Sequence, residues 1–598
     1  MMASTSMNRC FLPHADNKAM NQALRIGQSN RLMVSRLVVN ASFEEAILKS
    51  GEKKPMLVQQ SIVNKFGSYK KVENIRRWGT EGVFTESFGG IRKDSTDNSS
   101  GEVEVIEHER KIGGVLVNVY EEQGGIEAVP AVSGDVCESN PEKKQDAVVG
   151  ATEGTRWAIL IAGSKGYGNY RHQAAVCHAY QILKDGGLND ENIVVMMYGD
   201  IVYDENNPTP GILINEPNGP DVYQGVPKDY VGEDVNSSNF WDVLLGNKNA
   251  LAGTGSGKVV ASGPNDTIFI YYADHGAPSR LSMPSPDDGL DAEAFNLALQ
   301  IKHYSKGYKS MLIYIEACYA GAMFQTHLKP GLNVYATTAS DPTGKSFGCF
   351  SLPEYGICVA DFYSAIWMRH CHISDMTTVT LNNHYEFDRE ETSRYQEVSV
   401  TRYGDIEKLG DQSMSTYIGG KSTRSGVHYS SKTGHEADSH NYINRIDIGL
   451  AYFQQQVWLT DSSTLLMLYP WVHYQNDSLG TKLRAEAWRT YQNGLLQRIY
   501  IEASMDLIGE FLFGTTEKAT TAVEAVRPAG QPIVDDWNCY QTMVETYEKI
   551  CGPFSPYGLE DLRALATICN AGVKPEDLAK AAEYACSILG KRPLQLEI

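Results

Sequence analysis

The chain has 598 residues, which is enough for two to four domains of ordinary size. Its formal net charge is -20 and no concentrated basic stretch is present, which excludes nucleic acid and anionic membrane surfaces as partners. No run of about twenty apolar residues occurs, so the sequence predicts no transmembrane segment.

The first 150 residues carry little fold signal. Residues 1–42 are rich in Ser, Asn and Arg, contain one acidic residue, Asp16, and lack the apolar core of a secretory signal. That composition resembles an organellar transit peptide. Residues 112–120 favour a strand, whereas the Gly-, Ser- and Glu-rich stretches around them favour a linker. We therefore interpret residues 1–150 as an N-terminal extension of targeting or linker type.

An alternation of strand and helix patterns begins near residue 156. Residues 156–163 form an apolar run that ends in glycine, residues 172–187 have apolar positions at helical spacing, and residues 192–200 contain a second apolar run. A strand, a helix and a strand in succession make a βαβ unit. The sequence therefore predicts an α/β fold whose parallel sheet has helices on both faces.

The stretch GTGSGK at residues 253–258 invites comparison with a phosphate-binding loop. Val259 stands where such a loop has Ser or Thr, Ala252 stands at the first glycine position, and no strand precedes the stretch. A surface loop is the better interpretation.

Two apolar runs deliver reactive side chains. The run TIFIYYADHG ends at His275 and Gly276, and the run SMLIYIEAC ends at Cys318. Both are typical of a buried strand that ends in a tight turn at the edge of a sheet. A thiol needs a base to attack an amide, and the carbonyl oxygen needs hydrogen-bond donors as it becomes an oxyanion. We predict Cys318 as nucleophile and His275 as base, with the N–H groups of Gly276 and Cys318 as donors.

The other candidate residues also follow predicted strands or lie in loops. The carboxyl ends of strands in an open α/β sheet converge on one crevice, so residues far apart in sequence can meet there. Those expected to meet are residues 168–172, His275, Cys318, Ser346 and Asp361.

The C-terminal part is helical and contains a group of four cysteines. An even cluster predicts two disulfides and an oxidising compartment, with three connectivities open and four buried thiols as the alternative. This conflicts with the transit-like N-terminus, and we give the cysteines more weight. The four are Cys539, Cys551, Cys569 and Cys586.

Several stretches resemble the legumains, the asparaginyl endopeptidases that are called vacuolar processing enzymes in plants. In the family's order they read GSKGYGNYRHQAAVCHAYQIL, GVPKDYVGEDV, SGPNDTIFIYYADHG, YIEAC, LNVYATTAS and VRPAGQPIVDDWNCY, and they span roughly residues 150–595. The resemblance implies a caspase-like catalytic domain over residues 151–405, with a mostly parallel sheet flanked by helices. It also implies a connecting segment over residues 406–485 and an all-α, disulfide-bonded prodomain over residues 486–598. This prodomain would block the active site until acid triggers cleavage.

The resemblance also implies roles for single residues. His275 and Cys318 correspond to the catalytic dyad, Gly276 lies beside them, and Asn169 corresponds to the residue that orients the histidine. The pocket for an Asn side chain corresponds to Arg171, His172, Glu316, Ser346 and Asp361.

The chemistry of an amide agrees with this pocket. An amide has one acceptor and two donors, so Arg171 suits its oxygen, and Glu316 and Asp361 suit its nitrogen. A protonated Asp would mimic Asn at low pH. The disulfides implied by the resemblance are Cys349–Cys358, Cys539–Cys569 and Cys551–Cys586.

The sequence departs from the family around the dyad. Ala273 precedes the Asp-His-Gly motif, where the family usually has Ser, and residues 277–280 read Ala-Pro-Ser-Arg instead of beginning Gly-Gly-Pro. Residues 319–322 read Tyr-Ala-Gly-Ala instead of Glu-Ser-Gly-Ser, and Lys345 replaces one of two pocket serines. These changes bear on primed-side specificity, catalytic strength and the ratio of hydrolysis to ligation, but not on the dyad.

We therefore expect a cysteine endopeptidase that cleaves after Asn, and after Asp in acid, and is made as a zymogen. No cofactor and no metal are expected. The expected partners are protein substrates and the chain's own prodomain, and a dimeric zymogen is compatible with the resemblance. The expected location is an acidic, vacuole-like or lysosome-like compartment, and Asp461 is the expected site of acid-dependent self-cleavage. Two alternatives stay open: a peptide ligase that uses the same thioester, and a catalytically impaired paralogue that acts as a binding or storage protein.

Overall fold

The computed structural model describes residues 106–112, 115–122, 125–130, 154–352, 354–394, 399–420, 460–476, 479–514, 523, 527 and 531–590. The transit-like segment predicted over residues 1–42 lies outside these residues. The sheets and helices that form the site belong to one compact unit, which spans Asp97–Ser587.

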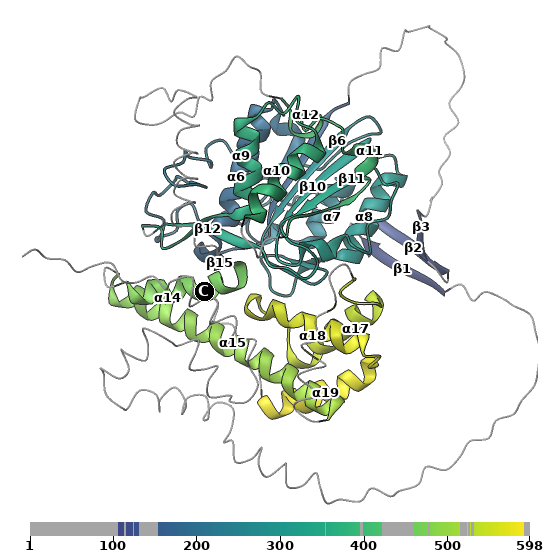
Figure 1. The fold of residues 1–598 in the computed structure, drawn as a ribbon, viewed down its shortest axis with the longest axis vertical. Helices are drawn as coiled ribbons and strands as arrows, with labels where there is room; N and C mark the ends of the chain where they lie inside the picture. The colour runs from purple at the N-terminus through teal and green to yellow at the C-terminus, as the bar shows by residue number, and fades with distance from the viewer. Residues whose placement is uncertain are drawn as a thin grey trace, which may run out of the picture. The chain divides into compact units, whose positions relative to one another are not determined.

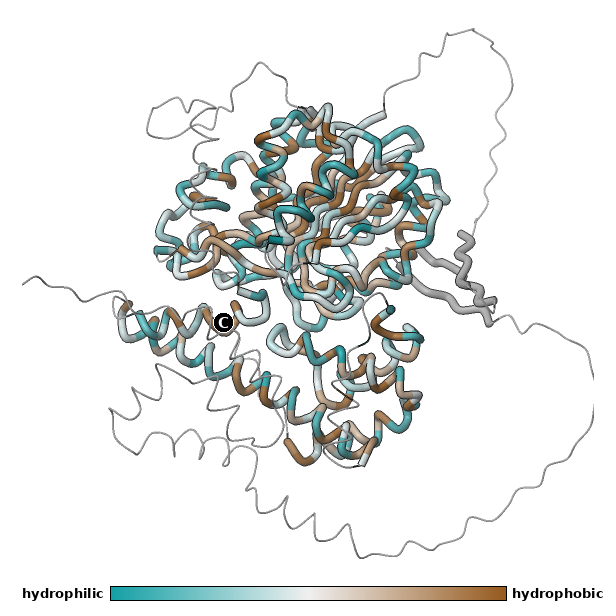
Figure 2. The backbone as a smooth tube through the Cα atoms, viewed as in Figure 1, coloured by the Kyte–Doolittle hydropathy of each residue, from teal (hydrophilic) through white to brown (hydrophobic). Residues whose placement is uncertain are grey.

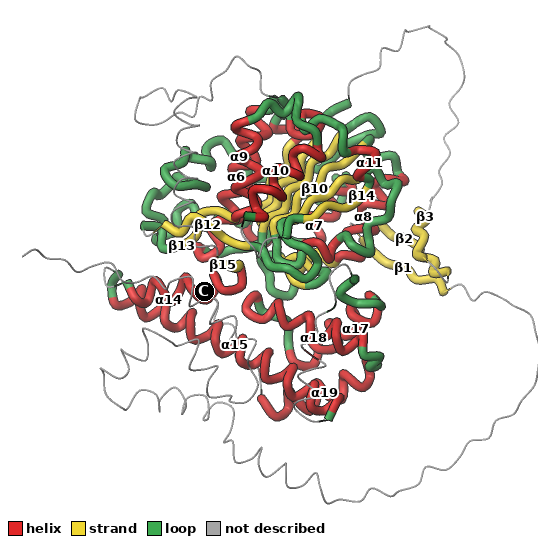
Figure 3. Tube along the Cα trace, viewed as in Figure 1, coloured by secondary structure: helices red, strands yellow, loops and turns green. Residues whose placement is uncertain are grey.

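A six-stranded sheet forms the centre of the structure, as Figures 1 and 3 show. Its first five strands in chain order are parallel, and the last is an antiparallel edge strand. The mostly parallel sheet and the predicted βαβ unit are therefore confirmed. In spatial order the strands are β14 (Thr401–Gly404), β11 (Val334–Thr338), β10 (Ser310–Glu316), β6 (Thr267–Ala273), β4 (Arg156–Ala162) and β5 (Ile193–Met196).

Helices cover both faces of this sheet because its strands are apolar on both sides. In β6, Phe269 and Tyr271 pack on one face and Ile268 and Ile270 on the other, following the two-residue period of a strand. Figure 2 shows the resulting concentration of hydrophobic residues along the strands. Helices α6 (Tyr170–Asp185), α9 (Phe362–Ile373), α10 (Leu381–Ser393) and α12 (Ser415–Ile418) pack on the first face, and α7 (Ser237–Leu245) and α8 (Ala292–Tyr304) pack on the second.

Three small antiparallel sheets and one short helix complete the α/β region. The sequence predicted one strand near residues 112–120, and the structure has a three-stranded meander there. Its strands are β1 (Ile106–Ile112), β2 (Val115–Glu122) and β3 (Gly125–Pro130). The second sheet consists of β7 (Gly276–Ala277), β8 (Arg280–Ser282) and β9 (Gly289–Asp291). The third sheet consists of β12 (Phe347–Leu352), β13 (Ile357–Asp361) and β15 (Thr460–Asp461). The short helix is α11 (Ile406–Leu409).

The C-terminal part is helical, as predicted. The disulfides Cys539–Cys569 and Cys551–Cys586 are both present. One helix, α14, lies in the connecting segment, where we predicted neither helix nor strand. The helices are α14 (Ser462–Gln475), α15 (Thr481–Phe513), α17 (Trp537–Cys551), α18 (Leu562–Asn570) and α19 (Pro575–Leu589).

The expected disulfide between Cys349 and Cys358 is wrong, because both residues are buried free thiols. On the paired strands β12 and β13, Cys349 lies opposite Ala360 and Cys358 lies opposite Ser351. The two cysteines are therefore not directly opposite each other on the paired strands.

The GTGSGK stretch is a loop with no phosphate-binding geometry. The ammonium group of Lys258 lies 2.9 Å from a carboxylate oxygen of Asp229 and donates to the main-chain oxygens of Asp190 and Ile193. These contacts hold the loop against the sheet, so Lys258 has a structural role.

Candidate active site

The site forms where β6 and β10 end side by side. Glu316, the last residue of β10, lies opposite Ala273, the last residue of β6. The N–H of Asp274 donates to the Glu316 main-chain oxygen at 3.0 Å, which continues the pairing past both strands. A Cβ atom on Gly276 would lie 2.3 Å from the main-chain oxygen of Cys318. Only glycine permits this approach of the two turns.

His275 is oriented by Asn169, which precedes helix α6. The Asn169 Nδ2 group donates to the Lys165 main-chain oxygen at 3.0 Å, so its Oδ1 faces the imidazole. His275 Nε2 lies 2.9 Å from that Oδ1. Since the amide oxygen can only accept, Nε2 carries the proton and Nδ1 has a free lone pair. The neutral imidazole is thus held in the tautomer that can act as a base.

Cys318 is surrounded by the main chain and side chain of Ser346. The N–H of Ser346 donates to Cys318 Sγ at 3.2 Å, and Ser346 Oγ lies 3.5 Å from the same sulfur. Among the described residues, no hydrogen bond joins Cys318 to His275. Burial raises the pKa of the Cys318 thiol to about 11, and the hydrogen bonds from Ser346 oppose this rise. The sulfur is therefore a neutral thiol in this arrangement.

His172 lies behind the dyad in a fully buried cluster. Its Nδ1 is 2.7 Å from Ser164 Oγ and 3.0 Å from a carboxylate oxygen of Asp274, and its ring meets the His275 ring edge to face. Burial lowers the pKa of both histidines to about 3. His172, Asp274 and His275 each have a donor atom within 4.8 Å of the others, so these three could hold a metal ion. In the structure, His172 contacts Ser164 and His275 contacts Asn169.

A polar pocket lies beside the dyad, at the junction of α6, β10 and α9. Arg171 Nε donates to Asp361 Oδ1 at 2.7 Å, and both side chains are 1% exposed. Glu316 Oε2 accepts hydrogen bonds from the N–H and the hydroxyl of Ser364, near the start of α9. Burial and the neighbouring Asp361 charge raise the pKa of Glu316 well above its usual range.

Each of these three charged side chains keeps one buried atom without a hydrogen-bond partner among the described residues. The atoms are Arg171 Nη2, a donor, and Asp361 Oδ2 and Glu316 Oε1, which are acceptors when the two carboxyl groups are ionised. Asp361 Oδ2 also lies 3.7 Å from His172 Nε2. A buried polar atom that lacks a hydrogen bond lowers the free energy of unfolding by about 1–3 kcal/mol. One donor and two acceptors are the complement of a primary amide, which has one acceptor and two N–H donors.

The segment Thr460–Gln475 lies directly against the site. Strand β15 pairs with β12 so that Asp461 lies opposite Phe347, and the N–H of Ser462 donates to the Ser346 main-chain oxygen at 3.0 Å. Leu465 is 6% exposed, and its Cδ1 would lie 2.4 Å from a Cβ atom on Gly348. The same Cβ position is 3.5 Å from Arg171 Cδ. Leu465 therefore packs beside the polar pocket.

Lys345, one of the departures from the family, joins the site to the helical region. Its ammonium group lies 2.7 Å from Glu560 Oε2 and 3.4 Å from Asp461 Oδ1. Burial alone would lower the pKa of Lys345, but these two carboxylates outweigh it and raise the pKa above its usual value. The Asp461 side chain also accepts from the N–H and hydroxyl of Thr464 and so caps α14.

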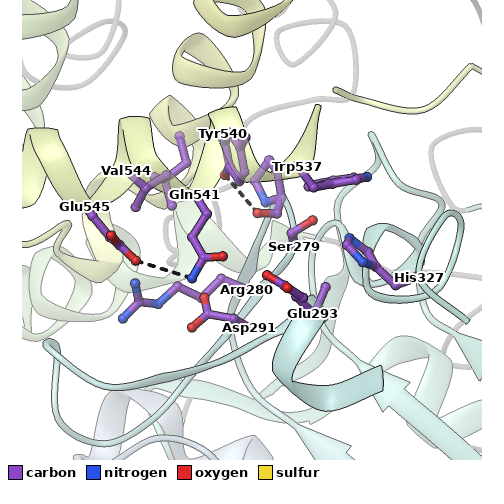
Figure 4. Close-up of a pocket in the computed structure, with 13 residues that line it drawn as sticks. Ser279, Arg280, Asp291, Glu293, His327, Trp537, Tyr540, Gln541, Val544 and Glu545 are labelled. Carbon is purple, nitrogen blue, oxygen red and sulfur yellow. Dashed lines mark hydrogen bonds between the residues drawn. The ribbon is translucent and has the colours of Figure 1, made fainter. Parts of the chain in front are cut away.

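The loop after His275 and Gly276, residues 277–280, contacts helix α17. The Tyr540 hydroxyl donates to the Pro278 main-chain oxygen at 2.9 Å, and Arg280 lies 3.6 Å from a carboxylate oxygen of Glu548. Figure 4 shows the small pocket between the two elements, with Arg280 and Asp291 on one side and Gln541 and Glu545 on the other. The residues that differ from the family here thus form part of a contact with the helices.

The structure brings together nearly all the residues that the sequence predicted. Asn169, Arg171, His172, His275, Gly276, Glu316, Cys318 and Asp361 form one continuous cluster, whereas Ser346 contacts the nucleophile rather than the three pocket charges. Sequence reasoning missed Ser164, Ser364 and Leu465. The position of Ser364 near the start of a helix after Asp361 was the one available signal.

Among the described residues, no helix has the length and apolar character needed to cross a membrane.

Comparison with known proteins gives two family matches. The model of the Peptidase C13 family matches residues 156–420, and that of the legumain prodomain matches residues 489–586. A vacuolar-processing enzyme of Citrus sinensis is 43% identical over 449 residues, which cover 74% of this chain and 86% of the relative. One of Vicia sativa is 42% identical, with 74% and 87% covered, and the delta-isozyme of Arabidopsis thaliana is 41% identical, with 73% and 91% covered.

Proposed function

The chain belongs to the Peptidase C13 family and is a cysteine-type endopeptidase, and from this premise we propose that it cleaves peptide bonds on the carboxyl side of Asn. The observation that carries the proposal is the set of three unpaired atoms on Arg171, Glu316 and Asp361. An Asn side chain satisfies all three at once. An apolar side chain would leave them unpaired, which disfavours it strongly.

The proposed reaction follows the geometry of the dyad. Nδ1 of His275 takes the thiol proton, and Cys318 Sγ attacks the carbonyl carbon after Asn. The N–H groups of Gly276 and Cys318 stabilise the oxyanion. His275 then gives its proton to the leaving amine, and a thioester forms. Water, deprotonated by His275, releases the acid product.

We propose that the segment Thr460–Gln475 keeps the chain in a zymogen state. Strand β15, Ser462 and Leu465 lie where a substrate would approach Cys318 and the pocket. They also bury the dyad, so both the thiol and the imidazole stay neutral. Removal of this cover exposes both groups to water, which reverses the effect of burial on their pKa values. This supports activation by displacement or cleavage of the segment.

The proposal extends to the acidic compartment. At low pH a protonated Asp side chain presents a hydroxyl donor and a carbonyl acceptor, so the same pocket accepts it less completely than Asn. The names of the relatives, vacuolar-processing enzymes, agree with a vacuole-like location. Cleavage after Asp461 requires its side chain to leave Lys345 and the α14 cap first.

A series of peptides that differ at one position tests the specificity. Asn, Gln, Asp and Leu are compared as the residue before the cleaved bond, with the activated enzyme at pH 5.5 and pH 7. We expect kcat/KM for Asn to exceed that for Leu by at least about a thousandfold, since buried polar groups would lose their partners. Equal cleavage after Leu would overturn the proposal.

The same assay separates hydrolysis from ligation. A competing amine peptide is added, and the products are identified by mass spectrometry. We expect mainly the hydrolysed acid; a predominant joined peptide would assign the chain to the ligases instead.

A further inference from the structure

A second buried cluster of histidine and carboxylate side chains lies away from the catalytic dyad, between α9 and α10. His370 and Cys371 are near the end of α9. His384 and Asp388 are four residues apart on α10, so they lie on the same face of that helix. The two histidine rings stack with centroids 4.6 Å apart. Side chains that bind metals well are therefore presented by two facing helices.

The distances between the donor atoms are short. One donor atom each from His370, His384 and Asp388 lies within 4.8 Å of the others. The Cys371 thiol lies 3.6 Å from His384 Nε2, and Asp388 Oδ2 lies 3.3 Å from His384 Nδ1. Ligands in a tetrahedral zinc site lie about 2.0–2.3 Å from the ion, and thus roughly 3.5 Å from one another. A small rotation of side chains would bring one donor atom each of His370, His384 and Asp388 around one ion.

The cluster also has polar atoms that the protein itself leaves unpaired. His370 Nδ1 and both carboxylate oxygens of Asp388 are buried and have no hydrogen-bond partner among the described residues. His370 is 6% exposed and Asp388 is 0% exposed. An ion pair between His384 and Asp388 alone leaves the His370 nitrogen unsatisfied. A cation between the residues would satisfy all of these atoms at once.

We propose that His370, His384 and Asp388 bind one divalent transition-metal ion of the zinc class. Two imidazoles and a carboxylate suit Zn²⁺ better than Mg²⁺ or Ca²⁺, which prefer oxygen ligands. Arg369, next to His370 in the sequence, lies 3.9 Å from the Glu391 carboxylate, which offsets its charge.

The position of the cluster gives the ion a structural role. It would tie the end of α9 to α10. The start of α9 contributes Ser364, whose N–H and hydroxyl hold Glu316 in the pocket, and Asp361 precedes the helix. The ion would therefore stabilise the helix that supports the specificity pocket. This role goes beyond the proposed cleavage after Asn and does not depend on it.

The test uses the full chain after treatment with a chelator, dialysis and reloading with Zn²⁺ or Co²⁺. Metal content is measured after gel filtration, and the Co²⁺ form is examined for the visible absorption of a four-coordinate site. We expect one ion per chain in the wild type. We expect Asp388→Asn and His384→Gln to bind Zn²⁺ at least about tenfold more weakly.

Two variants serve as controls. His178→Gln removes a different buried histidine, which pairs with His372 and Asn215, and should retain the ion. His275→Ala alters the other cluster that could hold a metal, so retention there assigns the ion to α9 and α10. Zn²⁺ should raise Tm of the wild type and not of Asp388→Asn. No bound ion in the wild type, equal binding by Asp388→Asn and His384→Gln, or loss of the ion in His275→Ala would each overturn the proposal.

Discussion

The specificity pocket and the surface that contacts the helical region are both rich in charge, but they are built in opposite ways. In the pocket, Arg171, Glu316 and Asp361 are buried and each keeps an unpaired atom. At the contact surface, Lys345 is shared by Asp461 and Glu560, and both partners are half-buried.

This difference indicates two purposes. A rigid, unsatisfied set of polar atoms gains most from a ligand that completes it, whereas paired charges near water are weak and reversible. The first arrangement suits recognition of a substrate. The second suits a cover that has to leave.

The largest loss of activity is expected when the proposed nucleophile, Cys318, is replaced. Cys318→Ala should reduce peptide cleavage by at least about a thousandfold, because no other group can form the thioester. It should also abolish labelling by a thiol-reactive Asn peptide. Cys177→Ala, which changes a buried cysteine outside the dyad, is the control and should still be labelled. Retained labelling in Cys318→Ala would exclude Cys318 as the nucleophile.

The second largest loss of activity is expected for a substitution in the specificity pocket. Arg171→Lys keeps the positive charge near Asp361 but loses the planar group that directs a second N–H toward the ligand. We expect kcat/KM for Asn peptides to fall about a hundredfold, and the preference for Asn over Leu to shrink. Arg402→Lys is the matched control, since Arg402 contacts Asn382 and Glu386 at the edge strand β14. Unchanged preference in Arg171→Lys would show that this pocket does not read the amide.

These two regions also differ in how far the sequence could reveal them. The strand ends at His275 and Cys318 follow from local apolar patterns, and the closeness of Arg171, Glu316 and Asp361 follows from the convergence of loops at one sheet edge. The central sheet and the two C-terminal disulfides were predicted correctly for the same reason, because they depend on local patterns or on the resemblance.

The contacts of Lys345, Leu465 and Pro278 were not predictable. Each depends on how the helical region docks, and residues of that region are more than a hundred positions away in sequence. The Cys349–Cys358 disulfide was predicted wrongly because the two cysteines are not opposite each other in the register of β12 and β13. Residue identity alone does not determine that register. The residues that depart from the family at 277–280 and 345 share one property in the structure: they contact α14, α17 or the turn that holds Glu560.

At the contact surface the expected effects are modest. Lys345→Ser removes the cation between Asp461 and Glu560 and should cost about 1 kcal/mol of contact free energy. This corresponds to about fivefold more of the open form, and so to about fivefold higher activity of the uncleaved chain. Lys482→Ser, at an exposed position with an i,i+4 partner, is the control. No rise in basal activity of Lys345→Ser would separate this contact from the inhibition.

Two carboxyl groups at the contact surface, Asp461 and Asp291, should make contributions to stability that depend on pH in opposite ways. Burial is the largest cause that acts on Asp461 and would raise its pKa, but Lys345 and the hydrogen bonds from Ser463 and Thr464 outweigh it and lower the pKa. A lowered pKa means that its contribution to stability is present above about pH 4 and is lost as the pH falls further. The α14 cap should therefore resist moderate acid.

Asp291, next to α17, behaves in the opposite way. Burial raises its pKa to about 6, against the opposing charge of Arg280, and Glu548 and Glu545 add to the rise. The contribution of Asp291 to stability is therefore fully present below about pH 4 and is lost as the pH rises through 6.

Acidification from pH 7 to 5 should tighten the α17 contact before it loosens α14. Hydrogen exchange in Cys318→Ala, followed separately for residues 462–475 and 537–551, measures this order. Protection of 537–551 should increase between pH 7 and pH 5, and Asp291→Asn should remove that increase because its side chain stays neutral. A fall in protection of 462–475 already at pH 6 would mean that groups other than Asp461 control the cover.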